Sequence, residues 1–130
     1  MKWTVEFYKK ENKEIPIKEF LNSLPEKHRA KAYWTIELLK DYGTTLREPY
    51  TKSLSGDQYK GLWELRIKFA SDISRIFYFI HVGKTFIILH GFIKKTNETP
   101  KKELEIARNY MEDYLRRCKE WKNPLYHGKK

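Results

Sequence analysis

Three consecutive segments rich in β-branched and aromatic residues lie between Gly61 and Pro100, and they constrain the fold more than any other part of the chain. Two short polar breaks, at residues 70–72 and 82–84, separate the segments. Apolar runs joined by such short connections predict an antiparallel meander of three strands. The rest of the chain is then expected to cover this sheet.

Cationic side chains lie in or beside these predicted strands, where a buried and unpaired charge costs stability. They are Arg66, Arg75, His90, Lys94 and Lys95. Strict alternation predicts one apolar sheet face, which should pack on helices, and one mixed face with cations among aromatic residues. On the third strand, alternation places His90, Phe92 and Lys94 on the same face as Ile88.

The flanking segments predict one short strand and three helices. Alternation at residues 3–8 predicts the strand, and apolar residues spaced by three and four predict helices at about 16–24, 25–42 and 100–121. Residues 44–60 contain turn-forming residues and are expected to be irregular.

The resulting order, β-α-α-β-β-β-α, predicts an α+β domain with a mainly antiparallel, twisted sheet and helices packed on one face. We expect a single domain at residues 1–122 and a loose basic tail at residues 123–130.

The formal net charge of +10 over 130 residues predicts a polyanionic partner, such as nucleic acid, a ribonucleoprotein, an anionic membrane or an acidic protein. No apolar run approaches the length that spans a bilayer, no secretory signal pattern begins at Met1, and Cys118 is the single cysteine. These features predict a cytoplasmic protein that does not enter a membrane.

Motifs for nucleotide cofactors and metals are missing from the sequence. It contains no Walker phosphate loop and no dinucleotide fingerprint, and the four histidines and Cys118 are too scattered for a metal-ligand spacing. We therefore expect neither a cofactor nor a metal.

Cations among aromatic side chains can hold a phosphodiester and stabilise the extra negative charge of its transition state. The substrate's own 2′-hydroxyl would be the nucleophile, so the protein would supply positioning, a base and an acid. A lysine serves as a base where neighbouring cations or burial lower its pKa. Further RNA contacts are expected from Lys52, Lys60, Lys68 and Phe92.

Structural roles for the same residues stay open. Arg66 could pair with Glu64 or with a helix carboxylate, and His90 could be a hydrogen-bonded core histidine. Lys94 and Lys95 could guard a strand edge. Tyr78 alternates with the cationic face and is assigned to packing.

Three segments resemble the RelE/HigB superfamily of bacterial toxins, and above all its phage-derived HigB-type branch. They are LWELR at 62–66, SRIFYF at 74–79 and LHGFIKKTNETP at 89–100. The likeness includes the two helices predicted before the meander and the sequence IAR at 106–108, so it covers nearly the whole chain to about Tyr114.

This resemblance implies a RelE-like fold and the toxin of a type II toxin–antitoxin module. Such toxins are metal-independent mRNA endoribonucleases that usually act on ribosome-bound message. The expected protein partner is a HigA-like helix-turn-helix antitoxin, and operator DNA would be contacted only through that antitoxin.

The resemblance also assigns site residues by position. Arg66 and Arg75 match strand arginines that contact the scissile phosphate, and Lys94 and Lys95 fall where the last strand delivers basic or polar site residues. His90 is a further candidate, because the catalytic set varies between branches. Arg75→Ala is expected to slow cleavage roughly a hundredfold and to leave thermal stability unchanged or raised.

Two other functions remain open. ParE-type toxins share this fold class and poison DNA gyrase, and a non-catalytic module could bind RNA or the ribosome with the same charge.

Overall fold

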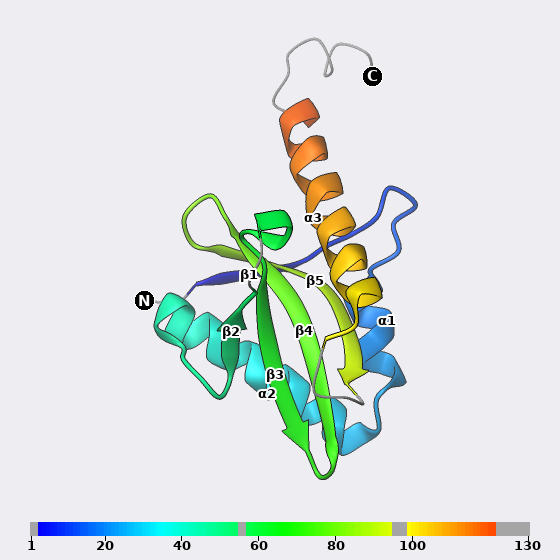
Figure 1. Ribbon diagram of the computed structural model, residues 1–130, viewed down its shortest axis with the longest axis vertical. Coiled ribbons are helices and arrows are strands. Elements are labelled where there is room, and N and C mark those ends of the chain that lie inside the picture. Colours follow the sequence, from blue (N-terminus) through cyan, green and yellow to red (C-terminus); the bar gives the residue numbers. More distant parts are fainter. Residues whose placement is uncertain (1–2, 55–56, 95–98, 122–130) are drawn as a thin grey trace.

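The computed structural model describes residues 3–54, 57–94 and 99–121, and a five-stranded sheet with the order β1-β5-β4-β3-β2 runs through its middle (Figure 1). The strands are β1 (Thr4–Phe7), β2 (Thr51–Ser53), β3 (Trp63–Phe69), β4 (Asp72–His81) and β5 (Thr85–Lys94). The helices are α1 (Pro16–Ser23), α2 (Glu26–Tyr42) and α3 (Lys101–Trp121), and the short 3₁₀ turns are η1 (Gly43–Thr45) and η2 (Asp57–Tyr59).

The predicted α+β class and the antiparallel meander β3-β4-β5 are confirmed. β1 adds to β5 in parallel, which makes the sheet mixed. Within the segment expected to be irregular, β2 pairs antiparallel with β3, so that expectation was wrong for three residues. Only Thr51 of this strand is buried, and its hydroxyl lies 2.5 Å from that of Tyr78, which packs in the core as predicted.

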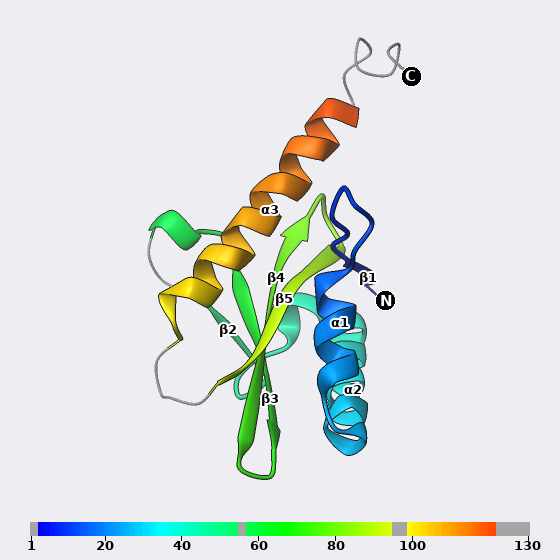
Figure 2. The same cartoon turned by 90° about the vertical axis from the view of Figure 1, so that its right-hand side faces the viewer.

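Helices cover both faces of the sheet, so the prediction that they pack on one face was wrong (Figure 2). α1 and α2 lie on one side, where their apolar residues meet those of β3 and β4, such as Leu65 and Ile76. α3 lies on the other side, where Leu104 and Ala107 join a cluster that contains Phe77. The face predicted to be mixed is therefore apolar over most of its length, and α3 removes that apolar surface from water.

A β-bulge in β5 changes which side chains share a face. Phe77 pairs with His90 but Tyr78 pairs with Ile88, which leaves Leu89 as the extra residue. Strict alternation had predicted that His90 shares a face with Ile88. That prediction was wrong, because His90 faces α3 whereas Ile88 faces α1. The same shift brings Phe92 and Lys94 to the face that carries Arg75 of β4, which is directly opposite Phe92.

Gly91 follows the bulge and faces α1. A Cβ atom at this position would lie 2.4 Å from the ring of Phe20 and 3.0 Å from Ile17, both on α1. Glycine is therefore required for α1 to approach β5 this closely.

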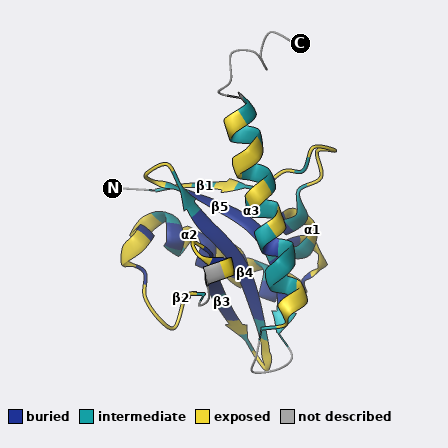
Figure 3. Cartoon of the chain, turned by 45° about the horizontal axis from the view of Figure 1, so that its top comes forward, coloured by how far each residue is buried: buried dark blue, intermediate teal, exposed yellow. Residues whose placement is uncertain are grey.

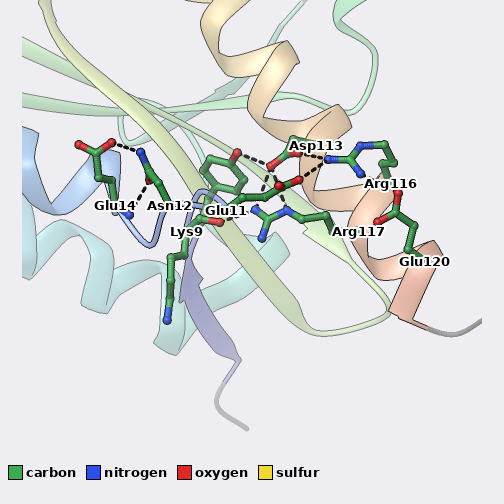
Figure 4. Close-up of polar contacts among 9 residues, drawn as sticks. Lys9, Glu11, Asn12, Glu14, Asp113, Arg116, Arg117 and Glu120 are labelled. Atoms are coloured by element: carbon green, nitrogen blue, oxygen red, sulfur yellow. Dashed lines mark hydrogen bonds and ion pairs between the residues drawn. The ribbon is translucent and has the colours of Figure 1, made fainter. Parts of the chain in front are cut away.

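Buried residues are concentrated in the middle of β3, β4 and β5, between the two helical layers (Figure 3). α3 continues beyond the sheet, and its C-terminal turns are tied to the segment after β1 by a polar network (Figure 4). Asp113 is central to this network: it accepts hydrogen bonds from Tyr8 at 2.5 Å, Arg116 at 2.6 Å and Arg117 at 3.0 Å. None of the described helices is long and apolar enough to cross a bilayer.

Candidate functional site

Four cations from four strands come together on the face of the sheet that α3 covers, near the N-terminal end of α3. They are Lys52 of β2, Arg66 of β3, Arg75 of β4 and Lys94 of β5, and we call them the basic cluster. Strand pairing explains the grouping, because Arg66 is directly opposite Arg75 and Lys52 is directly opposite Glu64. Side chains opposite each other on one face of a sheet are close neighbours.

Arg75 lies at the bottom of the cluster and is paired with Glu64. Its Nη1 atom donates to Glu64 Oε2 at 3.1 Å, and the two side chains are 3% and 4% exposed. Thr99, just before α3, donates to the other oxygen of Glu64 at 3.3 Å. Burial lowers the pKa of Arg75 although Glu64 acts to raise it. Glu64 therefore pairs with Arg75 and not with Arg66, the pairing that the structural alternative had offered.

Arg75 also carries an unsatisfied polar atom. Its Nε is buried and has no hydrogen-bond partner among the described residues. A buried guanidinium N–H without an acceptor is costly, and such groups in native structures call for an explanation. Here the donor that lacks an acceptor among the described residues belongs to Arg75, which the resemblance assigns to phosphate contact.

Arg66 is the accessible arginine of the cluster. It is half-buried, and its guanidinium makes no hydrogen bond or ion pair with a described residue. Its backbone N–H donates to the carbonyl of Tyr50, the residue just before β2, at 2.7 Å. This hydrogen bond fixes the backbone of β3 at Arg66. Its side chain lines a hollow together with Lys31 of α2 and Lys68 of the same strand. A fixed backbone and a planar fork without a partner in the described part of the chain suit the binding of a phosphate.

Lys94 is half-buried at the end of β5, and its pKa is lowered. Burial is the main cause, followed by the charge of Arg75; Glu64 acts in the opposite direction, and Arg66 and Lys52 add to the lowering. A lysine in such surroundings gives up its proton more readily than a solvated one.

His90 and Phe92 occupy the border between the cluster and α3. His90 Nε2 lies 2.6 Å from Glu103 Oε1, and its ring stacks on that of Phe92 with centroids 6.2 Å apart. Phe92 is 8% exposed and also packs on Phe77. His90 thus links β5 to α3, and Phe92 supports it from the apolar side.

The remaining candidates lie outside the cluster. Lys68 is exposed at the far end of β3, and its carbonyl accepts a hydrogen bond from Lys31. Lys60 is exposed after η2 and makes no side-chain hydrogen bond or ion pair with a described residue. Lys95 lies outside the described residues. Among residues 3–54, 57–94 and 99–121, no group of three His, Cys, Asp or Glu side chains is arranged to hold a metal ion.

Sequence reasoning missed the carboxylates and the hydroxyl that organise the site. Glu64, Thr99 and Glu103 hold Arg75 and His90, but none of them was a predicted site residue. A signal for Glu64 was present, since it lies two residues before Arg66 on the same predicted strand face. Thr99 and Glu103 carried no such signal, because their contacts depend on where α3 begins.

The arrangement suits an anionic, extended ligand. Arg66 and the exposed Lys52 can contact phosphate oxygens, Arg75 adds positive charge from beneath, and Lys94 can exchange a proton.

Comparison with known proteins gives one family match. The model of the family described as "Phage derived protein Gp49-like (DUF891)" matches residues 19–112, from α1 into α3. No curated protein matches the chain.

Proposed function

The chain belongs to the phage-derived Gp49-like family, a family of the RelE/HigB-like toxin type, and from this we propose that it is the toxin of a type II toxin–antitoxin module that cleaves mRNA. The basic cluster is the observation that carries the proposal. A chain that only needed a stable sheet would gain nothing from four cations held together on one face, because like charges at close range repel.

In the proposed reaction the 2′-hydroxyl of a nucleotide attacks the adjacent phosphorus, and the bond to the 5′-oxygen of the next nucleotide breaks. The attacking hydroxyl loses a proton and the departing oxygen gains one. Arg66 holds the non-bridging oxygens of the phosphate, and their charge grows in the transition state. Lys94 is the group best placed to exchange a proton, since its pKa is lowered by burial and by Arg75.

Arg75 acts from below the phosphate. Its ion pair with Glu64 fixes its guanidinium, and its charge strengthens the positive field at Arg66 and Lys94. His90 supports the end of β5 through Glu103 and Phe92.

The proposed partners follow from the same charge. Ribosome-bound mRNA is the proposed substrate, and an acidic surface of a HigA-like antitoxin is the proposed inhibitor. Charge-matched surfaces associate quickly, which suits an inhibitor that must capture a toxin.

A non-catalytic RNA- or ribosome-binding module is the second candidate. The burial of Arg75 favours it, because a guanidinium that is 3% exposed cannot reach a phosphate unless the site rearranges. Arg66 and Lys52 could bind RNA without any cleavage.

Induction of the chain in a bacterial host tests both candidates. We expect growth arrest, new 5′ ends in mapped cellular mRNA within minutes, and rescue by the protein encoded in the neighbouring reading frame. Arg66→Ala should abolish the new ends, whereas Lys18→Ala, at an exposed cation of α1 on the other side of the sheet, should not. Arrest without new mRNA ends supports the binding module, and normal growth with abundant folded protein contradicts both.

A further inference from the structure

Two hollows meet at Tyr50, on the edge of β3 beside α2. The first has a volume of about 350 Å³ and is lined by Tyr50 together with the cations Lys31, Arg66 and Lys68. The second has a volume of about 370 Å³, and Tyr50 shares it with Trp34 and Tyr42 of α2 and with the charged residues Arg47 and Glu48. The two hollows adjoin at Tyr50, which lines both, and we call them together the track.

Large aromatic rings are exposed along this track. Trp34 is 51% exposed, Tyr42 55% and Tyr50 36%. The rings of Trp34 and Tyr50 lie edge to face, with centroids 6.4 Å apart and planes at 69°. The two ring planes are steeply inclined to each other, and both side chains remain partly exposed to solvent. Clustered exposed aromatic residues are typical of binding surfaces.

The charge around the track favours a polyanion. Lys31, Arg66 and Lys68 line the first hollow, and Arg66 is also part of the basic cluster. A strand whose phosphate lies on Arg66 can thus continue along the track and reach Tyr50, then Trp34. Cations beside aromatic rings are the combination by which proteins hold unpaired nucleic acid strands.

We propose that Tyr50 and Trp34 are stacking platforms for unpaired RNA bases next to the phosphate held by the basic cluster. This inference rests on the proposed function and extends it, because it makes single-stranded RNA the ligand of the track and assigns it a subsite outside the cluster. An aromatic face accepts any base, so the platforms would add affinity and strand selectivity without a strong sequence preference.

Binding of a 2′-O-methyl oligonucleotide of about eight nucleotides, single-stranded or annealed to its complement, tests the inference. This probe lacks the nucleophilic hydroxyl, so binding is measured without cleavage. We expect Trp34→Leu and Tyr50→Leu each to weaken single-strand binding at least about fivefold, and Trp34→Phe and Tyr50→Phe to keep it. Duplex binding should change little in all four variants.

Matched controls separate stacking from charge and from unfolding. Tyr33→Leu alters an aromatic side chain of α2 that is 40% exposed and lines neither hollow, so it should bind as the parent does. The Leu variants should keep the salt dependence of binding, whereas Arg66→Ala should reduce its slope by about one. Equal melting temperatures would exclude unfolding as the cause.

The other outcomes contradict the stacking platforms alone or the proposed function as well. Leu variants that bind the oligonucleotide like the parent remove the platforms while leaving the proposed function intact, provided that the parent cleaves mRNA. Leu variants that lose only antitoxin binding make the track a protein interface. A folded parent that neither binds nor cleaves RNA overturns both the inference and the proposed function.

Discussion

Arg75 and Glu64 form an ion pair inside the sheet, with 3.1 Å between Nη1 and Oε2 and less than one twentieth of either side chain exposed. They lie on adjacent strands, and Thr99 adds a hydrogen bond to the carboxylate from the segment before α3. Through Thr99, the pair connects the sheet to the start of α3 within the basic cluster.

Truncation of Arg75 should therefore be costly, contrary to the sequence-based expectation that stability would hold or rise. Arg75→Ala leaves the carboxylate of Glu64 buried without its cation, and removal of one partner of a buried pair destabilises by about 3 kcal/mol. The double variant Arg75→Met/Glu64→Gln should be more stable than Arg75→Ala, because no buried charge is left alone. Urea unfolding measures both.

The double variant also separates stability from chemistry. If Arg75 strengthens the field at the scissile phosphate, the folded double variant should still cleave roughly a hundredfold more slowly than the parent. Parental cleavage by the double variant would make Arg75 a purely structural residue.

The protonation of Lys94 should respond to its neighbours. Lys52→Gln removes a positive charge that lowers the pKa of Lys94, so the pKa should rise. Lys60→Gln, which changes the net charge equally but lies outside the cluster, should have no such effect. Carbon NMR of the lysine side chains, titrated with pH, measures this directly, and an equal shift in both variants would contradict the assignment.

Acid should destabilise the fold through His28. This histidine is 1% exposed, stacks on Phe69 and lies 2.7 Å from the hydroxyl of Ser74. Burial lowers its pKa from 6.5. The unfolded chain then binds the proton more readily, so the stabilising contribution is complete above pH 6.5 and is lost as pH falls below it.

The matching variant is His28→Gln, which removes the titrating ring but keeps a polar side chain. It should flatten the fall of unfolding free energy between about pH 7 and pH 5 while lowering stability at neutral pH. A parental slope in this variant would show that other groups cause the acid sensitivity.

The C-terminal part of α3 should depend on Asp113. Its pKa is lowered, since the hydrogen bonds from Tyr8, Arg116 and Arg117 outweigh the opposing effect of burial. Asp113→Asn should cost about 1 kcal/mol and speed amide hydrogen exchange beyond Asp113. Glu112→Gln, an exposed neighbour on the same helix, is the control. Cleavage should be kept in both, because the network lies far along α3 from the basic cluster.

Much of the architecture could be predicted because its signals are local. Pro16 and Pro25 mark the starts of α1 and α2 to within one residue, and the polar breaks at 70–72 and 82–84 mark the two turns of the meander. β2 was missed since only one of its three residues is buried, which leaves no alternation to recognise.

The errors at the site have a different physical origin. Alternation assumes an unbroken strand, so the extra residue Leu89 reversed the predicted facing of His90. The side of the sheet that α3 covers is a long-range choice, and it decided that Phe92 is buried and that His90 meets Glu103. The track along Tyr50 and Trp34 joins a loop to the outer side of a helix, a relation that only the folded chain displays.

The close approach at Gly91 has a consequence for genetics. In a selection for cells that survive expression of the chain, substitutions of Gly91 should be recovered beside those of the basic cluster, because any side chain there must push α1 away from β5. Such survivors would carry a damaged scaffold and not altered chemistry. A map of inactivating mutations alone would therefore count Gly91 as a site residue, because it lies between the candidates His90 and Phe92 in the sequence.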